Sequence, residues 1–283
     1  GDLDGALADC NKVIELKPDD AHGYDARGML QLTRGDWDVA LDDFNKAIKL
    51  NPDDFNAYAN RGRIKNELGN PGGAQVDFNR AKELNPDDAD EYLVHGVEKQ
   101  DKGDLDGALA DFNKAIELNP KNADVYLCRG HLNYNSHKFA DALADFRKFC
   151  ELNSDDQYRD YAYFYVWLIR ARLGEKEAVT KELQAYWNNR ETGTPDDWPS
   201  RISSFLTGKL AELDFIEAAQ NSDDQKDNEQ HCEAYFYAGS KRLIAGDKTT
   251  ATDYFKKCLV TDVKGFSEYQ SAAAELHFLR ATN

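Results

Sequence analysis

The chain has 283 residues, with 52 Asp and Glu against 35 Lys and Arg, so its net charge is −17. It contains no run of about 18 apolar residues, the length that a membrane-spanning helix requires. Lys and Arg form no cluster either, and an acidic surface without a basic stripe disfavours binding to duplex nucleic acid. This charge balance favours basic or neutral macromolecular partners.

The cysteines are widely spaced and no two of them form a CxxC pair, which argues against a zinc ribbon or a thioredoxin-like site. Most occupy positions that hold small or apolar residues in the repeat described next. We therefore expect buried structural thiols. The five residues are Cys10, Cys128, Cys150, Cys232 and Cys258.

A repeat of 34 residues dominates the first half of the chain. GDLDGALADCNKVIEL begins at Gly1, and the nearly identical GDLDGALADFNKAIEL begins at Gly103, an offset of 102 residues or three repeats of 34. Related segments begin at Gly35 and Gly69. A fixed period of this length is the signature of stacked helical hairpins.

Four full repeats occupy 21–54, 55–88, 89–122 and 123–156. Small residues at positions 8 and 20 allow the two helices of a hairpin to approach closely, and aromatic residues at positions 4 and 24 fill the space beside them. Glycine marks the turn between the helices, and proline at position 32 ends the second helix. Position 4 holds Tyr24, Tyr58, Tyr92 and Tyr126, and position 8 holds Gly28, Gly62, Gly96 and Gly130. Position 20 holds Ala40, Ala74, Ala108 and Ala142, and position 24 holds Phe44, Phe78, Phe112 and Phe146. Position 32 holds Pro52, Pro86 and Pro120, with Ser154 in the last repeat.

This combination of period and residues resembles the tetratricopeptide repeat (TPR) family. The resemblance implies an all-α fold, a right-handed α-solenoid of antiparallel helix pairs that forms a TPR superhelix. It also implies that the first helix of each repeat lines a concave groove. One departure concerns positions 7 and 11, which are more polar than in the family and are expected to loosen the packing or to alter the groove. Position 7 holds Arg27, Arg61, His95 and Arg129, and position 11 holds Gln31, Lys65, Lys99 and Asn133.

The chain begins in the middle of a repeat, because Gly1 aligns with position 15. The first repeat therefore lacks its first helix, and the apolar face of its second helix would be uncovered. We expect either that the sequence is a fragment of a longer chain or that this end pairs with a second copy to form a homodimer. The uncovered face consists of Leu3, Ala6, Leu7, Cys10 and Ile14.

After residue 156 the repeat weakens. Residues 160–187 still indicate two helices around Gly174, followed by a loop at 188–200, a short helix pair at 199–206 and 209–219, and a polar connection at 221–230. A regular repeat returns at 232–265, and 266–279 predicts one final helix that caps the solenoid. The expected organisation is thus a regular array at 1–156, divergent TPR-like helix pairs at 157–231, and a final TPR with its capping helix at 232–283.

The C-terminal part also resembles bacterial TPR lipoproteins of the NlpI type, at Trp198, FLTGK at 205–209, EAYFYAG at 233–239 and the GD pair at 246–247. That resemblance implies, as an alternative function, a bacterial envelope adaptor that recruits hydrolases or proteases. The compartment stays open between bacterial cytoplasm and envelope.

The motifs that could carry chemistry are better explained by the repeat. DLDG at 104–107 lacks the later ligands of a calcium loop, GNPGG at 69–73 is not followed by the Lys of a phosphate loop, and no G-x-S-x-G occurs. Cys128 and His131 share a helix, but further zinc ligands are not evident. We therefore predict no enzyme activity, no cofactor, no catalytic residue and no metal site.

The groove positions of the first helices combine an apolar stripe with bordering carboxylates. Such a surface suits a protein or peptide segment with apolar anchors and basic flanks. The expected function is a protein–protein interaction scaffold that holds this segment in the concave groove. The predicted partner-binding residues are Asp25, Met29, Leu32, Arg63, Asn66, Glu67, Asp90, Leu93, Val97, Gln100, Asp124, Leu127, His131 and Tyr134.

Overall fold

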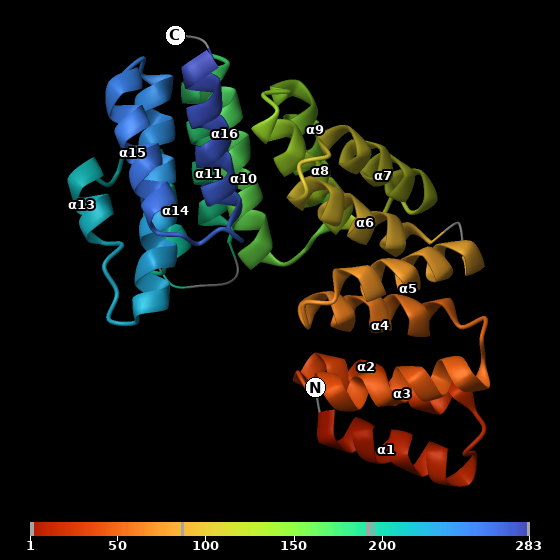
Figure 1. Cartoon of the computed structure of the whole chain (residues 1–283). Coiled ribbons are helices and arrows are strands. Elements are labelled where there is room, and N and C mark those ends of the chain that lie inside the picture. Colours follow the sequence, from red (N-terminus) through yellow and green to blue (C-terminus); the bar gives the residue numbers. More distant parts are fainter. Residues whose placement is uncertain (1–2, 86–87, 191–193, 195, 282–283) are drawn as a thin grey trace. The chain divides into compact units, whose positions relative to one another are not determined.

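Sixteen α-helices and no strands make up the part of the chain that the computed structural model describes, residues 3–85, 88–190, 194 and 196–281 (Figure 1). Within these residues, none of the helices is both long and apolar enough to cross a membrane. Gly1 and Pro86, which the repeat pattern uses as a turn residue and a helix terminator, lie outside the described residues. The predicted all-α solenoid of antiparallel helix pairs is confirmed.

The chain divides into two compact units, Gly1–Gly96 and Val97–Asn283, here called unit 1 and unit 2. The boundary falls within α6 (Ala89–Asp101). Unit 1 contains α1 (Leu3–Leu16), α2 (Ala21–Arg34), α3 (Trp37–Leu50), α4 (Phe55–Glu67) and α5 (Pro71–Leu84). Unit 2 contains α7 (Leu105–Leu118), α8 (Ala123–Asn135), α9 (Phe139–Leu152), α10 (Asp156–Arg172), α11 (Lys176–Asn188), α12 (Trp198–Leu206), α13 (Glu212–Glu217), α14 (Asp224–Ile244), α15 (Lys248–Val260) and α16 (Ser267–Ala281). The expected boundaries at 156 and 231, which follow the regularity of the repeat, stay a prediction.

Each hairpin of unit 1 is defined by local residue chemistry. In the pair α4 and α5, the Asp54 side chain accepts the Ala57 N–H at 3.2 Å and so caps the start of α4. Pro71 begins α5, where a missing N–H costs nothing. At the crossing, a Cβ added to Gly62 would lie only 2.6 Å from the Phe78 ring, so the helices meet as closely as glycine permits.

The hairpins of unit 1 stack in chain order, and the first helices α2 and α4 also contact each other. A small apolar core forms where they meet, containing Ala40, Phe44, Ala47, Ala57 and Ile64. The N-terminal α1 packs against α2 and leaves Val13 and Leu16 exposed.

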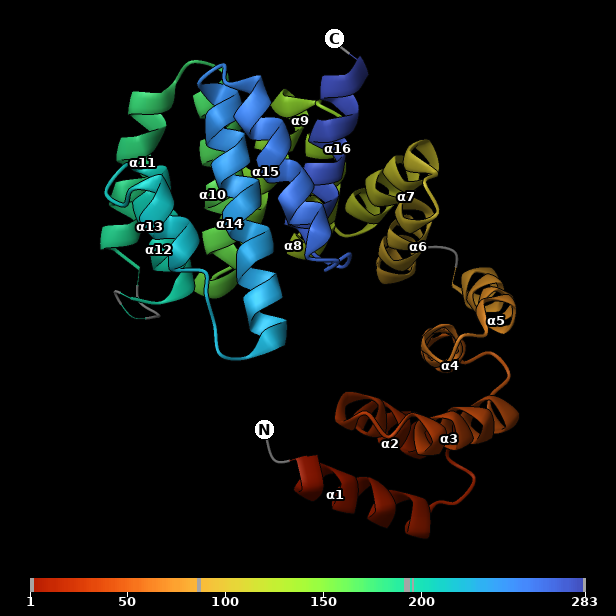
Figure 2. The same ribbon diagram turned by 60° about the vertical axis from the view of Figure 1, so that its left-hand side comes forward.

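Unit 2 has one large core around α10, whose consecutive residues 164–169 are all at most 1% exposed. A helix that is apolar on every side is buried on every side. Helices α9, α11, α12 and α14 pack around it, and α14, α15 and α16 lie side by side in both views (Figures 1 and 2). The C-terminal α16 packs on α15, as expected of a final helix, and also on α14 and on α8, more than a hundred residues earlier.

Two expected loops are shorter than the sequence indicated. The polar segment 221–230 is helical from Asp224, because Asp223 caps α14 by accepting the Lys226 N–H at 3.0 Å and acidic residues in the first turn suit the helix dipole. Likewise α12 begins at Trp198, where Asp197 accepts the Ser200 N–H at 2.9 Å. The helix pair predicted at 160–187 is present as α10 and α11.

Candidate partner-binding surface

Three repeats share a polar contact around a buried Asp, which we call the Arg–Asp–Asn cluster. In each, the Arg at position 7 donates to the Asp at position 23 of its own repeat and to the Asn at position 25 of the repeat before. Every nitrogen of the Arg27 guanidinium has an acceptor, with two bonds of 2.7 and 2.8 Å to Asp43 and one of 2.7 Å to Asn11. The other two clusters are Arg61, Asp77 and Asn45, and Arg129, Asp145 and Asn113.

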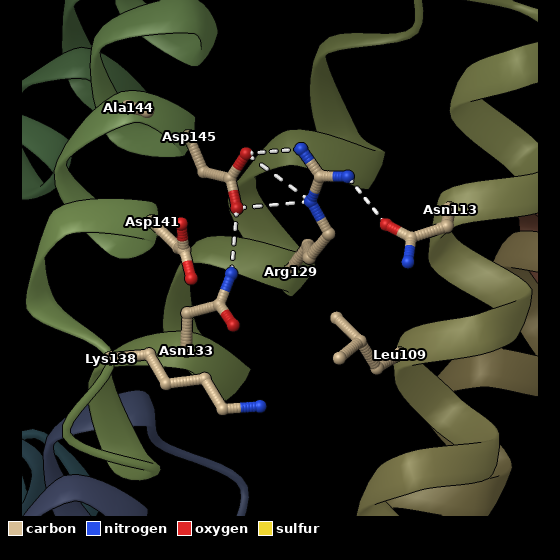
Figure 3. Close-up of a pocket in the computed structure, with 8 residues that line it drawn as sticks. All are labelled: Leu109, Asn113, Arg129, Asn133, Lys138, Asp141, Ala144 and Asp145. Carbon is tan, nitrogen blue, oxygen red and sulfur yellow. Dashed lines mark hydrogen bonds and ion pairs between the residues drawn. The ribbon is translucent and has the colours of Figure 1, made fainter.

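Figure 3 shows the cluster of the fourth repeat, where Asn133 at position 11 adds a bond of 3.0 Å to the Asp145 carboxylate. These residues line a polar pocket of ≈ 270 Å³. The polar residues at positions 7 and 11 were expected to loosen the packing. In the three repeats with Arg at position 7 the packing is not loosened, because the Arg charge is paired inside the repeat and the same side chain bonds to the preceding one. An effect on the groove stays a prediction.

The third repeat arranges its polar side chains in another way. His95 replaces Arg at position 7, and its Nε2 lies 3.2 Å from Glu91 one turn earlier in α6. Its ring meets Phe78 edge to face at 5.8 Å. The Asp111 carboxylate at position 23 pairs instead with Lys99 at 2.6 Å. In this repeat Lys99 at position 11, in place of the Arg at position 7, pairs with the Asp at position 23.

The groove positions of unit 1 remain accessible. Met29 on α2 is 50% exposed, and the three predicted residues of α4, Arg63, Asn66 and Glu67, are exposed as well. Asp90 on α6 is exposed, while the half-buried groove residues are Asp25, Leu32 and Leu93. Because α2 and α4 contact each other, their groove residues belong to one stacked pair of first helices.

Two carboxyl groups interact on this stacked pair. Burial, and next the charge of Asp54, raise the pKa of Asp25 to about 6, while His22 opposes the shift. The Oδ1 atom of Asp25 and the Oδ2 atom of Asp54 are buried, and neither has a hydrogen-bond partner among the described residues. Asp54 is only 8% exposed. Burial and the neighbouring Asp54 carboxylate thus both disfavour the ionised form of Asp25.

In unit 2 the predicted groove residues divide into accessible and covered ones. Val97 and Asp124 are exposed, and Leu127 packs against the large core. Gln100 is half-buried and lines a pocket of ≈ 400 Å³ that α16 helps to form. His131 lies between the rings of Phe146 and Tyr165, at 5.1 and 4.7 Å, and burial lowers its pKa to about 4.

Tyr134 is a correction to the predicted surface, because it is 1% exposed and belongs to the interior. Its ring meets Tyr165 at 4.9 Å and Phe236 at 6.5 Å. Its hydroxyl donates to Glu275 of α16, and burial raises its pKa well above the usual value. Helices α10, α14 and α16 thus cover this end of α8, and Tyr134 offers no surface to a partner.

The residues of α16 that cover α8 are polar. Glu275 pairs with Arg172 of α10 at 2.6 Å, and Ser271 donates to Asn135 of α8 at 2.7 Å. Sequence reasoning missed this contact. A signal was present, since Glu268, Ser271 and Glu275 recur at helical spacing on the face that packs against the core.

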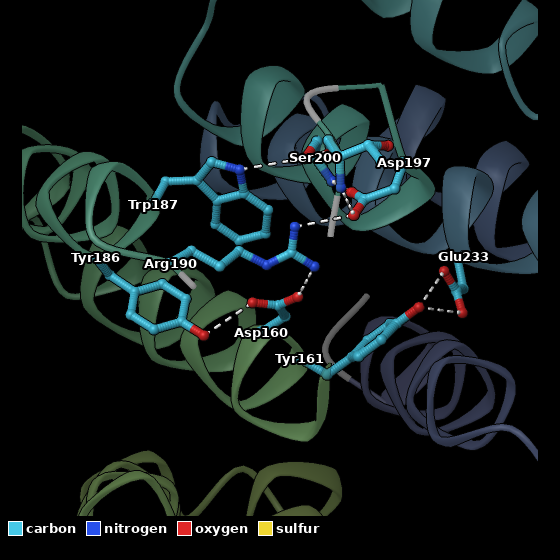
Figure 4. A network of polar contacts seen from close by, with 9 residues as sticks. Asp160, Tyr161, Tyr186, Trp187, Arg190, Asp197, Ser200 and Glu233 are labelled. Atoms are coloured by element: carbon cyan, nitrogen blue, oxygen red, sulfur yellow. Dashed lines mark hydrogen bonds and ion pairs between the residues drawn. The ribbon is translucent and has the colours of Figure 1, made fainter. Parts of the chain in front are cut away.

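A further polar network ties the divergent helices together (Figure 4). Asp160 of α10 accepts from Tyr186 at 2.8 Å and from Arg190 at 2.6 Å, and Arg190 also pairs with Asp197 before α12. Burial raises the pKa of Asp160 to about 6 against the lowering effect of these partners. Since Asp160 is fully buried, the network stabilises the packing of α10, α11 and α12.

A second buried carboxylate, Glu233 of α14, accepts hydrogen bonds from Tyr161 at 3.3 Å and from Trp198. Burial and the charge of Glu268 raise its pKa well above the usual value. Together with Asp160, it shows that the divergent segment is held by buried polar contacts between helices.

Comparison with known proteins agrees with this architecture. Models of the TPR family match residues 28–69 and 99–136, described as TPR repeat, and 55–88, described as tetratricopeptide repeat. A TPR protein from Parabacteroides merdae is similar over 92% of this chain and 98% of its own, with 19% identity and a TM-score of 0.53. PilF of Pseudomonas aeruginosa is similar over 90% of this chain and 97% of its own, with 18% identity and a TM-score of 0.51.

A larger structure shares the same fold. A chain of the APC/C hetero-tetramer Cut9–Hcn1 is similar over 91% of this chain and 46% of its own, with 15% identity and a TM-score of 0.57. The resemblance to NlpI-type lipoproteins stays a prediction. The repeat matches and the stacked helical hairpins together lead to one conclusion: the chain contains tetratricopeptide repeats, at residues 28–88 and 99–136.

Proposed function

We propose that the chain is a non-catalytic protein-interaction scaffold, and that unit 1 holds an extended or helical segment of a partner protein along α2, α4 and the start of α6. The observation that carries this proposal is the accessibility of the groove positions on α2 and α4, in contrast to the covered end of α8. An exposed Met beside half-buried Leu side chains is an adaptable apolar anchor site.

The partner segment carries a Lys or Arg next to its apolar anchors. Asp25 lies about one helical turn before Met29 on α2, and neither its Oδ1 atom nor the Oδ2 atom of Asp54 has a hydrogen-bond partner among the described residues. A cation there would oppose the effects of burial and of the Asp54 charge, which together raise the pKa of Asp25. Because this carboxyl ionises near pH 6, binding tightens as the pH rises from 5 to 7.

The two more specific expectations have no such support. Pairing of two copies through α1 stays a prediction, as does the envelope-adaptor role that recruits hydrolases or proteases. The apolar anchors and basic flanks that the sequence predicts for the partner segment are part of the proposed binding to α2 and α4.

The test is selection of peptides from a random displayed library on the full chain, followed by fluorescence anisotropy with purified peptides. Selected peptides should combine Lys or Arg with apolar residues. Met29→Glu and Asp25→Lys should each weaken binding at least tenfold. Val39→Glu on α3 is the matched control, since Val39 is also 50% exposed, and it should change affinity less than twofold.

Equal effects of Met29→Glu and Val39→Glu would place the binding surface elsewhere. Selection of acidic peptides that tolerate Asp25→Lys would contradict the proposed cation contact. Circular dichroism of each variant confirms that the helices remain folded.

A further inference from the structure

A basic pocket of ≈ 590 Å³ lies in unit 2 between α11, the end of α12 and α14. Its charged lining consists of Lys176, Lys181 and Lys241 with a single acid, Glu177. The chain as a whole has the opposite charge balance, because its acidic side chains outnumber its basic ones by 52 to 35. Like charges gathered around a cavity repel each other, so such a cluster is expected to have a counter-charge when it functions.

Three further acids, at the start of α11, within α11 and within α13, pair with arginines instead of with these lysines. Glu175 and Glu182 pair with Arg170, at 2.7 Å in the case of Glu175. Glu212 makes two bonds of 2.8 Å with Arg242 and accepts a third from Tyr254. In the described part of the chain, no carboxylate forms an ion pair with any of the three pocket lysines.

Lys241 is held in place without a neutralising partner. Its Nζ donates to the backbone carbonyl of Phe205 at 2.5 Å and lies 3.9 Å from the centre of the Phe205 ring. Burial and the charge of Lys176 lower its pKa to about 8, with Glu212 opposing the shift. The amine therefore remains mostly protonated at neutral pH, and its position is preorganised.

The start of α11 adds to the positive potential. Lys176 is the first residue of this 13-residue helix, and the side chain of the N-cap residue Glu175 makes no capping hydrogen bond. The unpaired N–H groups at the start of α11 and the positive end of its helix dipole lie at the first turn. This first turn lines the pocket.

We propose that this pocket binds an acidic segment of a partner protein, whose carboxylates pair with Lys176, Lys181 and Lys241. Three lysine ammonium groups around one pocket of ≈ 590 Å³ can pair with several carboxylates of one acidic segment.

The site is independent of the proposed groove function, because it lies in the other unit and selects the opposite charge. A scaffold with both features can hold one basic and one acidic segment. Since an acidic segment is repelled by the net charge of the chain, its binding depends on this pocket and falls steeply with added salt.

The probe is a fluorescent peptide of alternating Glu and Gly, measured by anisotropy with the full chain at low ionic strength. The same peptide with Gln in place of Glu is the control ligand. The double variant Lys176→Glu/Lys181→Glu should weaken binding of the acidic peptide at least tenfold, and Lys241→Gln should weaken it severalfold. The matched control is Lys248→Glu at an exposed position of α15 outside the pocket, and it should change affinity less than twofold.

The proposal is overturned if the acidic peptide does not bind at millimolar concentration, or if Lys248→Glu weakens it as much as the double variant. It is also overturned if inorganic phosphate competes as well as the peptide at equal concentration, because the pocket would then be a site for simple anions. Unchanged binding by the double variant, with its helices intact by circular dichroism, has the same consequence.

Discussion

The hydroxyl of Tyr134 on α8 donates to Oε1 of Glu275 on α16 at 3.4 Å, across 141 residues of sequence. The same carboxylate pairs with Arg172 of α10 and lies 3.7 Å from Nε2 of His137. His137 also stacks on Phe278 of α16 at 4.0 Å. The C-terminal helix is thus anchored on the first helix of the fourth repeat, where a partner was expected to bind.

Removing the Glu275 carboxylate tests this anchor. Glu275→Ala leaves Arg172 without its buried counter-charge, and we expect the free energy of unfolding to fall by about 3 kcal/mol. Tyr134→Phe removes a single hydrogen bond and should cost about 1 kcal/mol. Urea unfolding followed by circular dichroism measures both, with the exposed Glu217→Ala on α13 as control. Hydrogen exchange should rise in α16 for Glu275→Ala, and unchanged exchange there would contradict the anchor.

The Arg–Asp–Asn clusters differ in how many donors reach the carboxylate. Asp77 pairs with Arg61 and also with Lys65 at 2.7 Å, whereas Asp43 pairs with Arg27. Arg27→Gln therefore leaves a buried carboxylate unpaired and should cost about 3 kcal/mol. Arg61→Gln should cost about half as much, because Lys65 remains. Equal shifts in urea midpoint for the two variants would show that Lys65 contributes nothing to this pairing.

Replacing each of two glycines of the second repeat by alanine distinguishes the effect of close packing on stability from the effect of helix propensity. Gly62 faces Phe78 so closely that an added methyl group must displace the ring, and Gly62→Ala should destabilise unit 1 by about 1–3 kcal/mol. Gly72 lies in α5 with open space around its Cα, so Gly72→Ala should stabilise by about 0.5–1 kcal/mol through the higher helix propensity of alanine. Thermal unfolding should move in opposite directions, and a gain in stability by Gly62→Ala would contradict the close crossing.

The raised pKa of Asp25 makes stability depend on pH. An acid whose folded pKa of about 6 exceeds the ordinary 3.8 binds more protons when folded, so this group lowers stability as the pH rises from about 4 to 6. Below that window the folded and unfolded carboxyls are both protonated and the effect vanishes. Asp25→Asn should therefore stabilise the chain at pH 7, on the order of 1 kcal/mol for a partly exposed group, and not at pH 4. A benefit that is equal at both pH values would exclude titration of Asp25 as the cause.

Much of the local structure was predictable from the sequence alone. The 34-residue period, Gly62 opposite Phe78, and the capping residue Asp54 each act within one hairpin or between neighbours, so their spacing predicts the helices and the stack. Polar residues at positions 7 and 11 were recognised as departures from the family. Their partners Asp43, Asp77 and Asp145 also lie at a fixed position of the repeat, yet the pairing became evident only in the structure.

The tertiary structure alone decided which groove positions remain open. Met29 and Tyr134 occupy equivalent kinds of position on first helices, and the repeat pattern treats both as groove residues. Tyr134 is buried because α16 returns to α8, a contact whose free energy comes from burial and from the pairs of Glu275 with Arg172 and of Ser271 with Asn135. Contacts between residues so far apart in the chain depend on how all the intervening helices pack. The spacing of residues within one repeat does not predict this packing. The lysines of the basic pocket were brought together in the same way, since Lys241 meets Lys176 only when α14 packs beside α11 and α12.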